Sequence, residues 1–129
     1  MIRVLLIFIG AVWPLLTSAD DVQIVGVVFQ KTGPTTWRVD TTLKHADTGW
    51  EHYADAWRVV GTDGSELAVR ILYHPHVEEQ PFTRSVSATI AESVTEVVVE
   101  ARDKVHGWSA DRVSVNLNQP KGDRFTVNR

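Results

Sequence analysis

Short runs of alternating apolar and polar residues, separated by turn sequences, fill the chain after its first twenty residues and constrain its fold most strongly. In one such run, Trp37, Val39 and Leu43 alternate with charged or polar residues. A period of two places these apolar side chains on one face of a half-buried antiparallel strand. Strands are predicted in this way over residues 22–29, 37–43, 53–60, 67–73, 83–90, 96–103 and 113–117.

Turn signals that contain glycine or proline lie between these runs, and Asp63-Gly64 is a tight hairpin signal. Both faces of the run 53–60 carry apolar residues, which predicts an inner strand with Trp57 in the core. No stretch of useful length has the period of an amphipathic helix. The pattern predicts an all-β fold, a single antiparallel β-sandwich of about seven strands over residues 20–118, followed by a polar tail over 119–129.

Residues 1–19 have the order of a secretory signal peptide. A basic start at Arg3 precedes the apolar run 4–16 and the small residues Thr17-Ser18-Ala19, which predicts cleavage after Ala19. The run is shorter than the roughly 20 apolar residues of a membrane helix. Because no second run of this kind follows, we expect the mature protein to have no membrane span and to be periplasmic or secreted.

The composition narrows the class of partner and of chemistry. The formal net charge is −3, with 13 Lys and Arg against 16 Asp and Glu, so a basic surface for nucleic acid is not expected. The chain contains no cysteine, so we expect no disulfide, no thiolate chemistry and no lipid attached through cysteine. The one methionine is Met1, so a metal ion in the mature protein would meet no sulfur ligand.

The last third of the chain resembles the final hairpin of bacterial immunoglobulin-like and fibronectin-type domains. The likeness lies in the run Val97-Val98-Val99-Glu100-Ala101-Arg102-Asp103, followed by a loop and by Val113-Ser114-Val115. It implies an immunoglobulin-like sandwich that lacks the disulfide of antibody domains. The segments Trp50–Trp57 and His74–Arg84 also resemble those of small exported bacterial proteins to which no activity is assigned, which implies a shared site.

His74-Pro75-His76 is the most distinctive motif, and it predicts a metal site. On an extended backbone, residues two apart point to the same side, and Pro75 favours an extended His74 while excluding a central position in a sheet. Two imidazoles on one side of a loop or edge strand can bind one metal ion, and a useful site needs a third ligand. The predicted ligands are His74 and His76, with His106 as the third, His52 or Glu78 as a fourth, and His45 as a further candidate.

The ligand types narrow the identity of the metal. Imidazole and carboxylate suit Cu(II), Zn(II) and Ni(II), whereas Cu(I) prefers sulfur ligands. The general affinity order ranks Cu(II) before Zn(II), so the predicted function is that of a small exported protein that binds one of these two ions. An H-x-H motif also arises by chance, and the alternative is that His74 and His76 are exposed loop residues with local hydrogen bonds.

A second hypothesis needs no metal. Arg84, at the end of the loop 74–84, could form a structural ion pair or capture an anionic ligand. Trp50 and Trp108 lie beside glycines in predicted loops, where they could either stack on a sugar or peptide or cover the ends of the sandwich. In this hypothesis the loop and both tryptophans bind an envelope protein, a peptide or a glycan.

Catalysis has little support in the sequence. The chain has no cysteine nucleophile, no G-x-S-x-G motif and no glycine-rich phosphate loop. Glu78 and Glu79 do not form a catalytic pair on an extended chain, because adjacent side chains point to opposite sides. We therefore expect a binding protein that is not an enzyme and has no catalytic residue.

Overall fold

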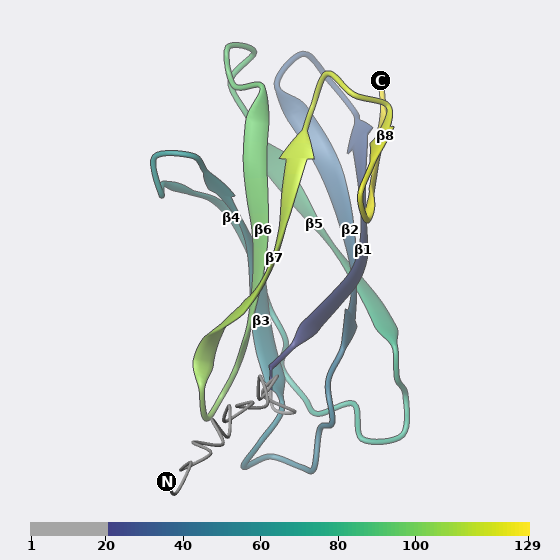
Figure 1. Ribbon diagram of the computed structural model, residues 1–129, viewed down its shortest axis with the longest axis vertical. Coiled ribbons are helices and arrows are strands. Elements are labelled where there is room, and N and C mark those ends of the chain that lie inside the picture. Colours follow the sequence, from purple (N-terminus) through teal and green to yellow (C-terminus); the bar gives the residue numbers. More distant parts are fainter. Residues whose placement is uncertain (1–20) are drawn as a thin grey trace, which may run out of the picture.

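Two β-sheets lie face to face in the computed structural model, which describes residues 21–129 (Figure 1). The predicted signal peptide lies outside these residues. Within this part of the chain every regular element is a strand, and no helix is long and apolar enough to cross a membrane. In chain order the strands are β1 (Gln23–Lys31), β2 (Thr36–Lys44), β3 (Ala54–Gly61), β4 (Glu66–Ile71), β5 (Phe82–Thr89), β6 (Glu96–Asp103), β7 (Gly107–Asn116), β8 (Lys121–Gly122) and β9 (Phe125–Asn128).

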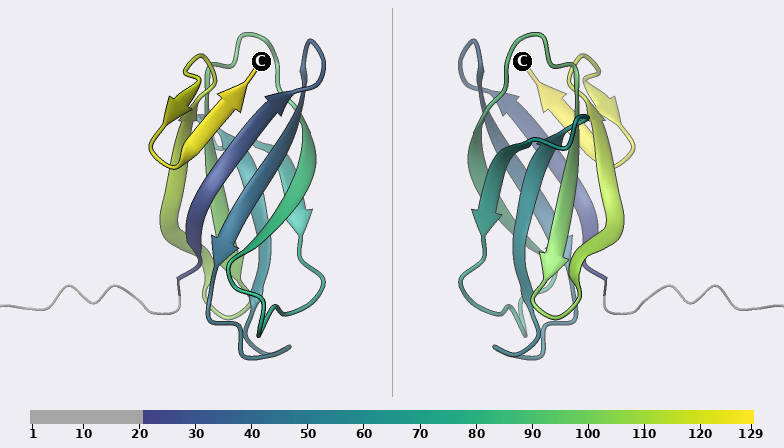
Figure 2. Two further views of the ribbon diagram at one scale, coloured as in Figure 1. Left: turned by 90° about the vertical axis from the view of Figure 1, so that its right-hand side faces the viewer. Right: turned by 90° about the vertical axis from the view of Figure 1, so that its left-hand side faces the viewer.

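The five-stranded sheet has the order β5-β2-β1-β9-β8, and the four-stranded sheet has the order β4-β3-β6-β7. Figure 2 shows the five-stranded sheet facing the viewer on the left and the four-stranded sheet on the right. These strand pairs are antiparallel except β1 with β9, which run parallel from Val27 opposite Phe125 to Gln30 opposite Asn128. The prediction of an all-β protein with two packed sheets is confirmed.

The C-terminal segment differs from the prediction. Residues 119–129, predicted as a polar tail, instead contribute β8 and β9. Phe125 and Val127 of β9 are buried and join the core. The alternation in β9 extends over four residues, and beside Pro120 and Gly122 it is too short a signal to predict a strand from the sequence.

The core between the sheets follows the predicted alternation. In β2 the side chains of Trp37, Val39 and Leu43 are buried, and those of their neighbours are mostly more exposed. β3 is an inner strand between β4 and β6 and has buried residues at both alternating positions, and Trp57 within it is 0% exposed.

One end of the sandwich gathers segments that are far apart in the sequence. β2 ends just before His45, β3 begins shortly after His52, and the β6–β7 hairpin starts at Asp103. The pairing of β3 with β6 sets Ala54 opposite Asp103, which brings the approach to β3 against the end of β6. This is the lower end of the molecule in Figure 1, where the loop 74–81 also lies.

Candidate metal centre

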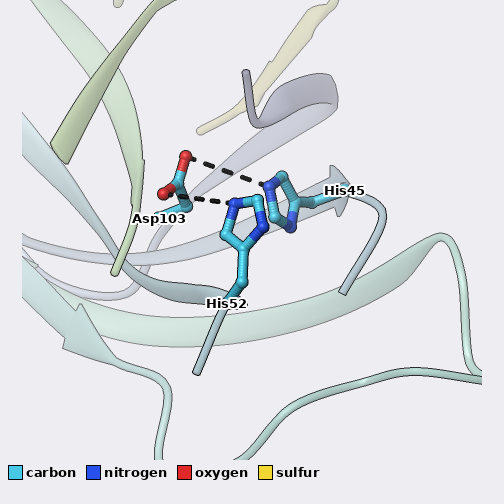
Figure 3. Close-up of side chains that lie close together, drawn as sticks. All are labelled: His45, His52 and Asp103. Carbon is cyan, nitrogen blue, oxygen red and sulfur yellow. Dashed lines mark ion pairs between the residues drawn. The ribbon is translucent and has the colours of Figure 1, made fainter. Parts of the chain in front are cut away.

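Three side chains converge at this end of the sandwich, as Figure 3 shows. His45, His52 and Asp103 each offer one ligand atom, and these atoms all lie within 4.8 Å of one another. The Nε2 atom of His52 lies 3.5 Å from Asp103 Oδ1, and the Nε2 atom of His45 lies 3.9 Å from Asp103 Oδ2. These three residues could hold a metal ion, since imidazole nitrogen and carboxylate oxygen are ligands of divalent transition metals.

Asp103 is held in place by the hairpin that it begins. Its carboxylate accepts hydrogen bonds from the backbone N–H groups of Val105 (2.8 Å) and His106 (2.6 Å). The Nδ1 atom of His106 lies 3.1 Å from both carboxylate oxygens. Gly107, with a φ of 77°, then turns the chain into β7 in the left-handed conformation that glycine adopts at least cost. The side chain of Asp103 is fully buried, so its charge requires partners at this site.

His45 is oriented by a second carboxylate. Its Nδ1 atom lies 2.6 Å from Asp47 Oδ1, which also accepts the backbone N–H of Ala54 at 3.0 Å. With the proton on Nδ1, the Nε2 lone pair of His45 faces Asp103. A carboxylate that holds the far nitrogen of an imidazole is the usual support of a metal-binding histidine.

The pKa of Asp47 reflects these bonds. Burial alone would raise the pKa of this carboxyl, but the hydrogen bond from His45 and those from the backbone amides of His76 and Ala54 outweigh burial and lower it below its ordinary value. Asp47 therefore remains an anion at neutral pH and keeps the proton of His45 on Nδ1. His45 and Asp47 are both buried, so the geometry of the pair is protected from solvent.

His52 contributes a further ligand atom to the group. Its Nε2 atom is buried and has no hydrogen-bond partner among residues 21–129. The nearest acceptor is Asp103 at 3.5 Å, without hydrogen-bond geometry. An Nε2 lone pair that faces this carboxylate oxygen at 3.5 Å is repelled by it, which has a cost. A cation between the two atoms removes that cost.

Binding of one ion would draw the ligand atoms of His45, His52 and Asp103 closer together. Ligand atoms of a tetrahedral zinc site lie about 3.3 Å apart, since each is about 2.0–2.1 Å from the metal. The contacts of 3.5 Å and 3.9 Å end on different oxygens of Asp103, and the ligand atoms of the group lie within 4.8 Å of one another, so the side chains must move closer to bind one ion. The buried His45 and Asp103 form the inner side of the site, whereas the side chain of His52 is 21% exposed.

His106 lies at the outer side of the cluster and could provide a fourth ligand. Its ring is 5.1 Å from that of His52, centre to centre, and its side chain is 42% exposed. The ring of His52 lies in turn 5.0 Å from that of His45. The structure thus brings together His45, His52 and His106, three of the five histidines that the sequence offered as ligands.

His74 and His76 occupy a separate position. Their ring centres are 4.4 Å apart, but neither belongs to the three-residue group that the described part of the chain offers to a metal. His76 is buried and stacked on Phe82 at 3.9 Å, and its Nε2 atom lies 2.8 Å from Nη2 of Arg84. Because the guanidinium is a donor, it occupies the lone pair of His76 that a metal would need.

The other predicted site residues are dispersed. His74 is exposed, with Nδ1 3.1 Å from the Pro75 carbonyl oxygen, and Glu78 is exposed on the same loop. Trp50 is 63% exposed and packs edge-on against Tyr53, with ring centres 6.0 Å apart. Trp108 is also exposed, and its ring stacks against the guanidinium of Arg58 at 3.8 Å rather than covering an end of the core.

Asp103 and Asp47 are the residues of the site that the sequence did not indicate. Asp47 lies between the predicted strands 37–43 and 53–60, and Asp103 is the last residue of the predicted strand 96–103. A signal was present for Asp103, since an aspartate followed by a short loop and a glycine is typical of a turn that the carboxylate itself bonds. That signal identifies a hairpin and gives no indication of the histidines from other loops.

Acidification is expected to destabilise the protein through His76. Burial, then the Arg84 guanidinium and His74, lower the pKa of His76 below its ordinary value of 6.5. At this histidine the unfolded chain therefore binds a proton more readily than the native state does. The contribution of neutral His76 to the free energy of unfolding is complete above about pH 6.5 and is lost as the pH falls further. Denaturant unfolding at pH 7.5 and 5.5 checks this, and His76→Gln is expected to lose less stability than the unaltered protein. An equal loss in both proteins would contradict it.

The fold and the site together define an all-β sandwich protein with a histidine–aspartate cluster at one end. The chain is 35% identical over 96 residues to a protein of the archaeon Halomicrobium mukohataei that carries the name "Putative lipoprotein". The matched region is 74% of this chain and 47% of that protein, so this chain spans about half the length of its relative, and the two are distantly homologous. No family model matches the chain, and no solved structure matches it.

Proposed function

We propose that the protein is a small exported binding protein that holds one divalent transition metal ion, Cu(II) or Zn(II), at His45, His52 and Asp103. The observation that carries the proposal is the buried, unbonded Nε2 of His52 beside the fully buried carboxylate of Asp103. Nitrogen and oxygen ligands suit both ions, and the chain contains no cysteine to favour Cu(I). His106 is the proposed fourth ligand on the solvent side.

The proposed role is to bind and release the metal, not to catalyse a reaction. Three ligands in the interior or at its boundary give affinity, and the proposed fourth, His106, is exposed on the side from which another molecule would approach. Export is supported by the predicted signal peptide and by the printed name of the homologue, since lipoproteins are exported to the cell envelope. A periplasmic or secreted protein of this kind would buffer the metal or hand it over.

We also propose that the sandwich is immunoglobulin-like. The supporting observation is the strand order β5-β2-β1 in one sheet and β4-β3-β6-β7 in the other. If β1, β2 and β5 are equated with strands A, B and E, and β3, β6 and β7 with strands C, F and G, the two sheets have the order of that fold. β8 and β9 are then additions beside strand A.

A calorimetric titration with Cu(II) and with Zn(II) tests the metal proposal. The unaltered protein is expected to bind one ion with a dissociation constant below about 1 µM, or about −8 kcal/mol. The double variant His45→Ala/His52→Ala is expected to lose this heat because two ligands are gone. The control is His74→Ala, which removes an exposed imidazole outside the cluster and should bind as the unaltered protein does. Loss of binding in the control alone would indicate that the metal binds at the His74-Pro75-His76 motif instead.

A second candidate function is that of an envelope interaction module that needs no metal and binds through the loop 74–84. The observation in its favour is the apolar exposure around this loop, where Tyr73 is 76% exposed and Val77 and Ile71 are also exposed. If the titrations give no heat with either ion, a search for a protein, peptide or glycan that binds this loop becomes the decisive experiment.

A further inference from the structure

We propose that metal binding at His45 is coupled to closure of the loop 74–81, and that Asp47 and Gln80 are the positioning residues that join them. The inference rests on the proposed metal-binding function. It assigns a role to the His74-Pro75-His76 stretch, which does not itself enter the cluster. In this arrangement the loop is closed when the metal site is filled and opens more readily when it is empty.

The first connection passes through the two oxygens of Asp47. Oδ1 bonds the Nδ1 atom of His45 at 2.6 Å, and Oδ2 accepts the backbone N–H of His76 at 2.8 Å. One buried carboxylate therefore holds the ring of a metal ligand and the middle of the loop at the same time. A metal on Nε2 of His45 makes its Nδ1 proton more acidic, which strengthens the bond to Asp47.

The second connection passes through the side-chain amide of Gln80. Its Oε1 atom accepts the backbone N–H of His45 at 3.0 Å, and its Nε2 atom donates to the carbonyl oxygen of His76 at 2.9 Å. Two independent side chains thus link the same two residues, one through the ring of His45 and the other through its backbone. The loop cannot open without breaking bonds that orient His45.

The far side of the loop is anchored to the five-stranded sheet. The ring of His76 is stacked on Phe82, the first residue of β5, and bonds Arg84 in the same strand. His76 therefore links β5 to the residues that support the metal site, while Tyr73 and Val77 near it are exposed. Closure of the loop arranges these exposed side chains, and opening releases them.

Coupling of this kind is reciprocal. If the closed loop favours metal binding by a given factor, bound metal favours the closed loop by the same factor. Two measurements on the purified protein at pH 7.5 therefore test one quantity, with Zn(II) as the probe. These are the zinc affinity of loop variants and the zinc dependence of amide hydrogen exchange in peptides that cover residues 74–81.

The variant Gln80→Ala is expected to bind zinc about 10- to 100-fold more weakly, the range seen when a residue that supports a metal ligand is removed. Gln80→Glu, which keeps the acceptor for the His45 amide, is expected to recover part of the affinity. The control is Asp63→Ala, which removes two hydrogen bonds to Ser65 in the β3–β4 turn, at the opposite end of β3, and should leave zinc affinity unchanged.

Zinc is expected to slow exchange in the loop peptides of the unaltered protein and of Asp63→Ala by about 5-fold or more, the lower end of usual couplings. It is expected to have a smaller effect in Gln80→Ala. Zinc that binds without protecting the loop, or that binds Gln80→Ala as tightly as the unaltered protein, overturns the coupling alone. Failure of the unaltered protein to bind zinc overturns the proposed function and the coupling together.

Discussion

Zinc at about a thousand times its dissociation constant is expected to raise the free energy of unfolding by about 4 kcal/mol, because only the native state assembles the ligands. For a domain of this size the gain corresponds to a melting temperature higher by roughly 15 °C. The variant Asp103→Asn is expected to lose most of this gain, since it removes the anionic ligand. Thermal unfolding with added zinc and with a chelator measures the difference for each protein.

Asparagine at position 103 keeps an oxygen for the backbone N–H groups of Val105 and His106, so the hairpin is expected to form. Without metal, the free energy of unfolding of the Asp103→Asn variant should be lower than that of the unaltered protein by about 1–3 kcal/mol at most, because the side-chain NH2 group cannot accept a hydrogen bond as a carboxylate oxygen does. The matched control is Asp111→Asn on β7, which weakens an ion pair with Arg124 but lies outside the cluster. Equal zinc gains in both variants would remove Asp103 from the site.

Trp57→Ala is expected to destabilise the protein by about 3–5 kcal/mol, the usual cost of truncating a large aromatic side chain in a core. Trp57 is 0% exposed and lies on the inner strand β3, so the cavity that it leaves is enclosed by both sheets. The control is Trp50→Ala, which removes a ring that is 63% exposed. Its expected cost is about 0.5 kcal/mol or less. Denaturant unfolding followed by circular dichroism compares the two, and similar costs would contradict the assignment of Trp57 to the core.

The sequence was sufficient for the strands that bury one face along their whole length. Alternation in the run that forms β2 predicted which of its side chains are buried, and the two apolar faces of the run 53–60 predicted the inner strand that carries Trp57. β9 was not predicted because its two buried residues, Phe125 and Val127, reach the core only through the pairing of β9 with β1, which the sequence alone does not show. A strand of this length is stabilised by its neighbours and leaves little trace in local periodicity.

The site was predictable in part. His52 and His106 were candidates on the grounds of residue type and loop position, and the structure brings them together with His45. Asp103 could not be added from the sequence, because its position beside His52 depends on the register of β3 against β6, and β4 and β5 lie between these strands in the chain. The prediction of a metal site at His74-Pro75-His76 assumes an extended backbone that leaves both rings accessible, whereas the ring of His76 is buried against Phe82.

The pairing of β1 with β9 has a consequence for self-association. A long strand at the margin of a sheet offers unpaired backbone groups to another molecule, and natural proteins avoid this with very short marginal strands. Here β1, with nine residues, pairs with β2 on one side, and β9 covers Val27 to Gln30 on the other. The strand left at that margin is β8, which has two residues. A second copy of the protein that approached β8 would find a strand of two residues with which to extend the sheet.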